Sequence, residues 1–218
     1  GAVFEDVGQW KRPWYFPINK DETMDEAVQR ESKNVRENAG VLDGSTLGKI
    51  EIKGKDALAF MNLIYTNSFS KMKPGTSRYA LMLGEDGMVK DDGIICKISD
   101  EHFIATTTTG GAATVLGCME EYAQTEWPNL NVYMNSITEQ YATFNISGPK
   151  TRNIIEKVFP EVNFSNEAFP FMTFQFHEYE DTPIRILRAS FTGEMGYEIY
   201  VPSNQALKIW EKIINFGK

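Results

Sequence analysis

The feature that most constrains this chain is an order of predicted elements that occurs twice: strand, helix, three strands, helix. In the first copy, 46–54 (TLGKIEIKG) is typical of a strand, and apolar residues follow at helical spacing in 56–67. Strand patterns then occupy 78–83, 88–98 and 102–109, before a helix that opens at Gly110. The stretch from about 44 to 135 therefore predicts one mixed unit.

The second copy begins at 140–147 (QYATFNIS) and continues with a helix that opens in GPKTR. Three further strand patterns and a final helix follow, in FMTFQFHEY, IRILRAS, GYEIYVP and SNQALKIWEKIINF, with Ser203 expected as the N-cap. Because strands and helices do not alternate regularly, we expect an α+β fold of two packed mixed lobes with antiparallel-rich sheets. The predicted lobes are 1–43 plus 136–218, and 44–135 as an inserted ferredoxin-like unit.

Composition excludes several classes of protein. The formal charge is −8 and the pI is near 4.9, which argues against nucleic acid as a partner, because that needs a basic face. No apolar run approaches the ~20 residues that span a bilayer, and no signal peptide is visible, so we expect a soluble protein with no membrane partner. Two cysteines, Cys96 and Cys118, exclude a disulfide scaffold and favour a cytoplasmic location. Two histidines leave little room for a metal site.

The two ends suggest a piece of a longer polypeptide. The chain starts at Gly1, a residue that a protease can leave on an expressed protein, and enters an aromatic segment at once. It stops directly after the helical pattern KIWEKIINF. We expect an excised piece, with a processed small protein as the alternative.

Two consecutive carboxylates in the pattern MVKDDGII are the first candidates for chemistry. Asp91 and Asp92 lie in a strand, so their side chains point to opposite faces of its sheet. One of them must then face an interior where an unpaired charge is costly. Gly93 beside them would permit the close approach of a ligand. The alternative is that both aspartates lie at a solvent-exposed end of the strand, since carboxylates are mostly exposed.

The pattern SFTGEMGYEIYVP holds the second pair of acids. Glu194 lies in a glycine-rich turn, and Glu198 lies inside an apolar strand, on the same face as Tyr200. A carboxylate flanked by aromatic residues can accept two parallel N–H donors from a planar ligand. The alternative is again a strand residue that faces solvent.

Five ordered motifs carry a resemblance: STLGKIEIKGKDALAFMNLIYTN, KPGTSRYALMLGEDGMVKDDGII, FIATTTTGG, ISGPKTR and FTGEMGYEIYVP. Together they resemble the folate-binding aminomethyltransferase family, whose best-known member is the T-protein of the glycine cleavage system, over essentially the whole chain. The runs TTTTGG, TEWP and FEDVGQWKRPWYFP look more like the folate domain at the C-terminal end of the heterotetrameric sarcosine oxidase α subunit.

This resemblance implies tetrahydrofolate as the ligand. By the family pattern, Asp92 is the catalytic acid and contacts the reactive side of the pterin near its folate nitrogens. Tyr79 would line the same pocket. Glu198 is similar to the family carboxylate that grips the amino and ring N–H groups of the pterin, which agrees with the bidentate pairing inferred from the strand pattern.

The chain also departs from the family. Thr107 and Thr108 stand nearest to an asparagine of the T-protein and are the matching folate contacts here, with a shorter reach. Phe191 replaces a tyrosine, while Glu194 shapes the turn and could share in recognition. The C-terminal barrel lobe of the family and its late arginine are absent from this chain, so a pocket completed by that lobe would be open.

The reaction that the resemblance implies is a one-carbon transfer. Oxidation of sarcosine at a flavin elsewhere in the complex would give an electrophilic imine of glycine. Its methylene passes to tetrahydrofolate, giving 5,10-methylenetetrahydrofolate and glycine, with Asp92 stabilising the cationic iminium. The expected partners are folate, this small imine, the rest of the parent polypeptide and other oxidase subunits. We expect no flavin in this chain, because it has no dinucleotide fingerprint, and no metal.

Three alternatives stay open at this point. The chain could be a folate-binding or regulatory module of the same fold without transferase activity, or a stand-alone T-protein-like aminomethyltransferase. It could also be a scaffold lobe whose acids face solvent. The sequence does not decide the amine donor or the oligomeric state.

Overall fold

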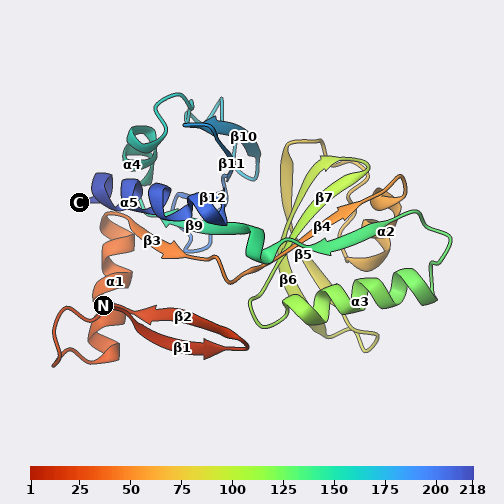
Figure 1. The fold of residues 1–218 in the computed structure, drawn as a ribbon, viewed down its shortest axis with the longest axis horizontal. Helices are drawn as coiled ribbons and strands as arrows, with labels where there is room; N and C mark the ends of the chain where they lie inside the picture. The colour runs from red at the N-terminus through yellow and green to blue at the C-terminus, as the bar shows by residue number, and fades with distance from the viewer. The chain divides into compact units, whose positions relative to one another are not determined.

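The computed structural model describes all of residues 1–218 and divides them into two compact units (Figure 1). The inserted unit is the continuous segment 47–140. The discontinuous unit combines 1–46 with 141–218. Each unit is built around its own five-stranded sheet, and all neighbouring strands are antiparallel, which confirms the predicted α+β class.

The sheet of the inserted unit has the strand order β5-β6-β7-β4-β8. Its elements are β4 (Gly48–Lys53), α2 (Ala57–Ile64), β5 (Thr76–Leu83), β6 (Val89–Ser99), β7 (His102–Thr107), α3 (Ala112–Thr125), β8 (Tyr133–Ser136) and the 3-10 helix η1 (Thr138–Gln140).

Both helices of the inserted unit pack on one face of its sheet. Apolar residues alternate along the strands, so that Ile50 and Ile52 of β4 reach the same core as Phe60 of α2 and Val115 of α3. This core also takes Ile95 of β6. Side chains one position away from these residues therefore lie on the opposite face of the sheet, which is where Asp92 is found.

The sheet of the discontinuous unit has the strand order β10-β11-β12-β9-β3. Its elements are β3 (Gly40–Asp43), β9 (Tyr141–Ser147), α4 (Thr151–Val158), β10 (Phe174–Tyr179), β11 (Thr182–Leu187), β12 (Gly196–Pro202), the 3-10 helix η2 (Ser203–Gln205) and α5 (Ala206–Gly217). Helices α4 and α5 share a core with one face of this sheet, which includes Ile155, Ile213, Tyr197 and Ile199.

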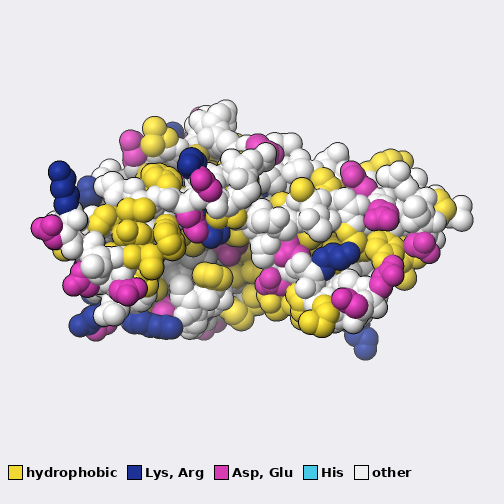
Figure 2. All heavy atoms as spheres, turned by 90° about the horizontal axis from the view of Figure 1, so that it is seen from below, with side chains coloured by type: hydrophobic (Ala, Val, Ile, Leu, Met, Phe, Trp, Pro, Cys, Tyr) yellow, Lys and Arg dark blue, Asp and Glu magenta, His cyan; other side chains and the backbone are white.

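A two-stranded ribbon and a helix precede these elements: β1 (Val3–Val7), β2 (Trp10–Tyr15) and α1 (Met24–Glu37). Their apolar side chains are unusually exposed, since Trp14 is 53% and Ile18 69% accessible, while Ala27 is the only buried residue of α1. Figure 2 shows apolar side chains gathered over this part of the chain, with acidic and basic groups interspersed on the same face.

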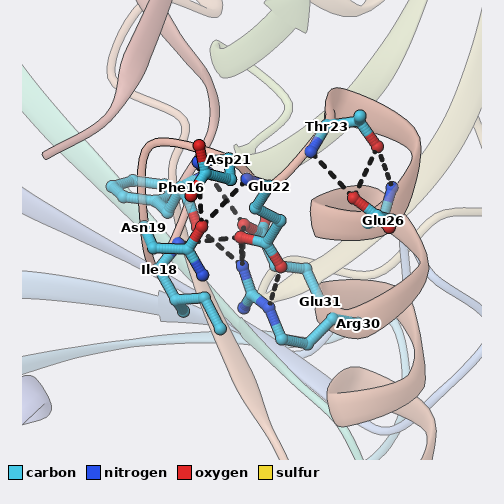
Figure 3. Close-up of polar contacts among 9 residues, drawn as sticks. All are labelled: Phe16, Ile18, Asn19, Asp21, Glu22, Thr23, Glu26, Arg30 and Glu31. Atoms are coloured by element: carbon cyan, nitrogen blue, oxygen red, sulfur yellow. Dashed lines mark hydrogen bonds and ion pairs between the residues drawn. The ribbon is translucent and has the colours of Figure 1, made fainter.

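Polar contacts rather than apolar burial hold the segment between β2 and α1 (Figure 3). Arg30 donates to both oxygens of Glu22, at 2.8 and 3.0 Å, and to the carbonyl of Phe16 at 2.7 Å. Glu22 also accepts the N–H of Ile18 at 2.7 Å. Thr23 caps α1, and its side chain and that of Glu26 satisfy each other's backbone N–H.

The predicted element order matches the structure in both units, with differences at the margins. The ribbon β1–β2 and the short strands β3 and β8 were not assigned from sequence. The prediction that Ser203 caps the last helix was wrong: Ser203 opens a 3-10 turn, and α5 begins at Ala206. None of the helices is both long and apolar enough to cross a bilayer.

Candidate functional site

The candidate site residues fall into two groups, one in each unit, and each group is described within its own unit. Tyr79, Asp92, Thr107 and Thr108 belong to the inserted unit. Glu194 and Glu198 belong to the discontinuous unit.

Asp92 lies on the face of the inserted sheet that the helices leave open. The hydroxyl of Tyr79, on the neighbouring strand β5, donates a hydrogen bond of 2.9 Å to Oδ2 of Asp92. This bond to a carboxylate raises the pKa of the Tyr79 hydroxyl, because losing the proton would place two negative charges together. Tyr79 is 54% exposed, so the pair is accessible from solvent.

Asp91 points to the other face of the same strand and is only 6% exposed. Its Oδ1 accepts the N–H of Asp92 at 2.8 Å and that of Thr108 at 3.3 Å. Its Oδ2 is buried without a hydrogen-bond partner and lies against Gly111, the residue that precedes α3. A negative charge is stabilised at the N-terminus of a helix, so α3 offsets part of the cost of this burial.

Thr107 and Thr108 both form hydrogen bonds within the loop that joins β7 to α3. Thr107 is 3% exposed, and its hydroxyl donates to the carbonyl of Thr108 at 2.9 Å. The hydroxyl oxygen of Thr108 accepts the N–H of Gly111 at 3.1 Å. Thr108 itself is exposed, so its hydroxyl proton can still reach a ligand, whereas Thr107 is committed to the loop.

Gly93 has a structural role within the sheet. A Cβ at this position would lie 1.8 Å from the carbonyl oxygen of Thr106 on the neighbouring strand β7. The glycine is therefore required by the close approach of protein backbone. The expectation that it permits the approach of a ligand stays a prediction.

Glu198 lies on a polar face of the discontinuous sheet, opposite the face that packs on α4 and α5. It is 9% exposed, and its Oε2 accepts a hydrogen bond of 2.5 Å from the hydroxyl of Tyr200. Asn145 is directly opposite on β9, and Arg185 is directly opposite Tyr200 on β11. All of these side chains are at least nine-tenths buried, so the face is an enclosed set of polar groups.

Glu194 is engaged by a residue distant in sequence. Arg36 of α1 binds its Oε1 at 2.8 Å, and the hydroxyl of Ser190 donates to its backbone carbonyl at 2.6 Å. Both contacts hold the turn between β11 and β12. Glu194 is thus placed as a residue that shapes this turn.

The structure contains no group of three or more His, Cys, Asp or Glu side chains that could hold a metal ion. His102 forms a 2.9 Å contact with Glu51, and burial lowers the pKa of His177. Both cysteines are buried free thiols.

The GCVT N-terminal domain family matches residues 1–218, which is the whole chain. The chain belongs to this family. The resemblance drawn from the sequence motifs is therefore confirmed.

Relatives of this GCVT domain include two kinds of protein. It is 50% identical over its full length to the sarcosine oxidase subunit alpha of Corynebacterium sp. (strain U-96), and 43% identical to that of Rhizobium meliloti (strain 1021). It is 31% identical over 98% of its length to an aminomethyltransferase of Alkaliphilus metalliredigens (strain QYMF). The chain spans 22–23% of the two oxidase subunits and 54% of the aminomethyltransferase.

Solved structures support the same fold. The aminomethyltransferase T of the glycine cleavage system from Bartonella henselae superposes with a TM-score of 0.80 at 24% identity, over 98% of this chain and 54% of that one. A chain of the heterotetrameric sarcosine oxidase from Corynebacterium sp. U-96 gives a TM-score of 0.61 at 9% identity, over 91% of this chain and 95% of that one.

Several residues of this GCVT domain were not singled out from sequence. Arg185 could have been picked out as a candidate, because it is a charged residue inside the apolar strand pattern IRIL. Which of the two consecutive acids faces inward depended on the register of β6, which the pattern left open. The contact of Arg36 with Glu194 spans 158 positions, and no local pattern indicates it.

Proposed function

We propose that this GCVT domain binds tetrahydrofolate and takes part in the transfer of a one-carbon unit to it. The observation that carries the proposal is the Glu198 carboxylate, which is buried on a polar sheet face and held by Tyr200. A carboxylate of fixed orientation can accept two parallel N–H donors from a planar heterocycle. Family membership supports this ligand class.

The residues present fit such a ligand. Glu198 offers a carboxylate of fixed orientation. Thr143, which lies on the neighbouring strand β9 directly opposite Tyr200, has a buried hydroxyl oxygen with no hydrogen-bond partner. A bound heterocycle could satisfy groups of this kind, which otherwise cost free energy in the interior. In the inserted unit, Tyr79 and Thr108 supply further hydroxyl groups beside accessible surface.

Asp92 is assigned the chemical role. Tetrahydrofolate would supply two nitrogen atoms that take over the methylene carbon, while their two N–H protons pass to the departing amine. The negative charge of Asp92 would stabilise the cationic iminium that carries the methylene. Because Oδ2 accepts the bond from Tyr79, Oδ1 is the atom that would face this cation or hold a proton in transit.

The donor that we propose is the imine formed by oxidation of sarcosine. The support is the 50% identity to a sarcosine oxidase α subunit, which is greater than the 31% identity to an aminomethyltransferase. We accordingly propose the rest of an oxidase polypeptide and further subunits as partners. Two free thiols support a reducing compartment such as the cytoplasm.

Binding can be tested on this chain by titration with tetrahydrofolate or its air-stable 5-formyl derivative, followed by calorimetry. We expect saturable binding that is weakened at least tenfold by Glu198→Gln, which keeps the shape of the side chain. p-Aminobenzoylglutamate, which lacks the pterin, should not compete. A folded wild-type chain that binds no reduced folate would refute the proposal.

The substitution Asp92→Asn, made in the intact polypeptide that contains this domain, distinguishes transfer of the methylene from binding of folate alone. If the domain is a transferase, the variant should bind folate but release the methylene as formaldehyde, the hydrolysis product of the imine. Unchanged transfer in this variant would favour the alternative of a folate-binding module without a catalytic role.

A further inference from the structure

Three side chains form a chain of contacts on the polar face of the discontinuous sheet. Glu198 and Tyr200 are two positions apart in β12 and therefore share a face, and the Tyr200 hydroxyl donates to Oε2 of Glu198 at 2.5 Å. Arg185, directly opposite Tyr200 on β11, places its guanidinium carbon 4.0 Å from the centre of the Tyr200 ring. Tyr200 thus contacts both the cation and the carboxylate.

All three side chains are nearly removed from water. Glu198 is 9%, Tyr200 1% and Arg185 6% exposed. A hydrogen bond from a phenol to a carboxylate is charge-assisted and therefore stronger than one between neutral groups. Burial also limits competition from water, so the Tyr200 hydroxyl can fix the plane of the Glu198 carboxylate.

The contact of Arg185 is directed at the ring of Tyr200. Its Nε is buried with no hydrogen-bond partner, so this part of the guanidinium is not held by a conventional acceptor. A cation over an aromatic face is attracted by the ring. The same positive charge stabilises negative charge that develops on the phenol oxygen, so it strengthens the hydroxyl as a donor.

We propose that Tyr200 and Arg185 are positioning residues for Glu198: Arg185 polarises and anchors Tyr200, and Tyr200 orients the carboxylate toward its ligand. This inference rests on the proposed function, because it assigns to Glu198 the recognition of a planar N–H donor. It goes beyond the proposed function in one respect: recognition of the ligand by Glu198 depends on two residues that do not touch the ligand.

The test measures binding of 5-formyltetrahydrofolate to this chain and to Tyr200→Phe, Arg185→Met and Arg185→Lys. Tyr200→Phe should weaken binding about tenfold to a hundredfold, the range for loss of a hydrogen bond to a charged group. Arg185→Met should also weaken binding, and Arg185→Lys, which keeps a cation, should recover part of the loss. Near-ultraviolet circular dichroism verifies that each variant is folded.

Tyr197→Phe is the matched control. Tyr197 is also fully buried in β12, but it lies on the opposite face, where its hydroxyl contacts the carbonyl of Phe164 at 3.5 Å. Its removal should leave folate affinity unchanged within about twofold. A general loss of packing in β12 would instead affect both variants alike and would overturn the assignment.

A double-mutant cycle with Glu198→Gln decides whether Tyr200 acts through Glu198. If it does, Tyr200→Phe should cause little further loss in the Glu198→Gln background. Two independent losses that multiply, or wild-type affinity in Tyr200→Phe, would overturn the inference while leaving the proposed function intact. A folded wild-type chain without folate binding would instead remove the proposed function itself.

Discussion

The hydroxyl of Tyr79 and Oδ2 of Asp92 are joined by a 2.9 Å hydrogen bond between residues 13 positions apart. The two strands that carry them are paired by the hairpin β5–β6, with Tyr79 opposite Ile94 and Leu81 opposite Asp92. The pair is thus diagonal across the strands, a separation that a long aromatic side chain can bridge. The hairpin alone therefore assembles an accessible phenol and carboxylate.

This pair predicts an altered titration of Tyr79. The Asp92 carboxylate raises the pKa of the phenol, so Asp92→Asn, which removes the charge, should lower that pKa toward its ordinary value near 10. The measurement is an alkaline titration followed by NMR of ring-labelled tyrosine. Tyr122, whose pKa is raised by its hydrogen bond to Glu85 in the same unit, should titrate identically in both proteins. A Tyr79 titration that is the same in both would contradict the hydrogen bond.

We expect substitution by alanine to have opposite effects on the free energy of unfolding at Gly111 and at Gly117. A Cβ at Gly111 would lie 2.2 Å from Oδ2 of Asp91, a carboxylate that its own hydrogen bonds hold in place. Gly111→Ala should therefore lower the free energy of unfolding by about 1–3 kcal/mol. A Cβ at Gly117, inside α3, would meet no atom within 4 Å, so Gly117→Ala should raise that free energy by about 1 kcal/mol. Urea denaturation of both variants gives the comparison, and equal signs would refute the prediction.

We expect removal of the Arg30 side chain to destabilise the chain locally rather than globally. Arg30→Met removes the bonds to Glu22 and to the Phe16 carbonyl, so the segment 16–23 should open more often. Hydrogen exchange at the Ile18 amide, which donates to Glu22, should accelerate several-fold. Lys33→Met, which removes only an exposed 3.9 Å pair with Glu37, should leave that exchange rate unchanged.

The turn between β10 and β11 predicts a pH-dependent contribution to stability. Lys208 and Lys212 both bind Glu180 at 2.5 Å, and chiefly the bond from Lys208 lowers the pKa of Glu180 to about 2. A carboxyl with a lowered pKa stabilises the folded state above its ordinary pKa near 4.5, and this contribution is lost as the pH falls toward 2.

The measurement compares urea unfolding of the wild type with that of Glu180→Gln between pH 7 and pH 3. The wild type should be the more stable at pH 7, and the two should converge as the pH falls below 5. Glu178→Gln, at an exposed position of β10, is the control for removing a carboxylate from the same hairpin. A difference that grows toward acid would contradict the assignment to Glu180.

The elements that sequence predicted well are those with a clear period. The alternation in GYEIYVP predicted β12 and placed Glu198 and Tyr200 on one face, because the period of a strand is two residues. The helices α2 and α3 follow from apolar residues at helical spacing. The roles of the candidate residues toward a ligand stay a proposal.

The elements that sequence did not predict lack such a period. The ribbon β1–β2 buries no residue fully, and its half-buried positions include Glu5 and Arg12, so its apolar residues do not mark an inward face. Strand β8 is a short edge strand of four residues. Contacts such as that of Arg36 with Glu194 depend on tertiary folding, and the choice of Asp91 as the buried acid depended on the register of one hairpin.

The pairing of β3 with β9 sets an order of events during synthesis. Asp43 pairs with Phe144, and the whole inserted unit lies between them in the chain. At ribosomal rates, β3 must wait on the order of 10 s before its partner strand emerges. The inserted unit, which is continuous, can collapse as soon as it has been made, whereas the discontinuous unit is completed only after 141–218 has also been made. Premature termination just after residue 140, before β9 has been made, should therefore leave the inserted unit folded and β3 without its partner strand.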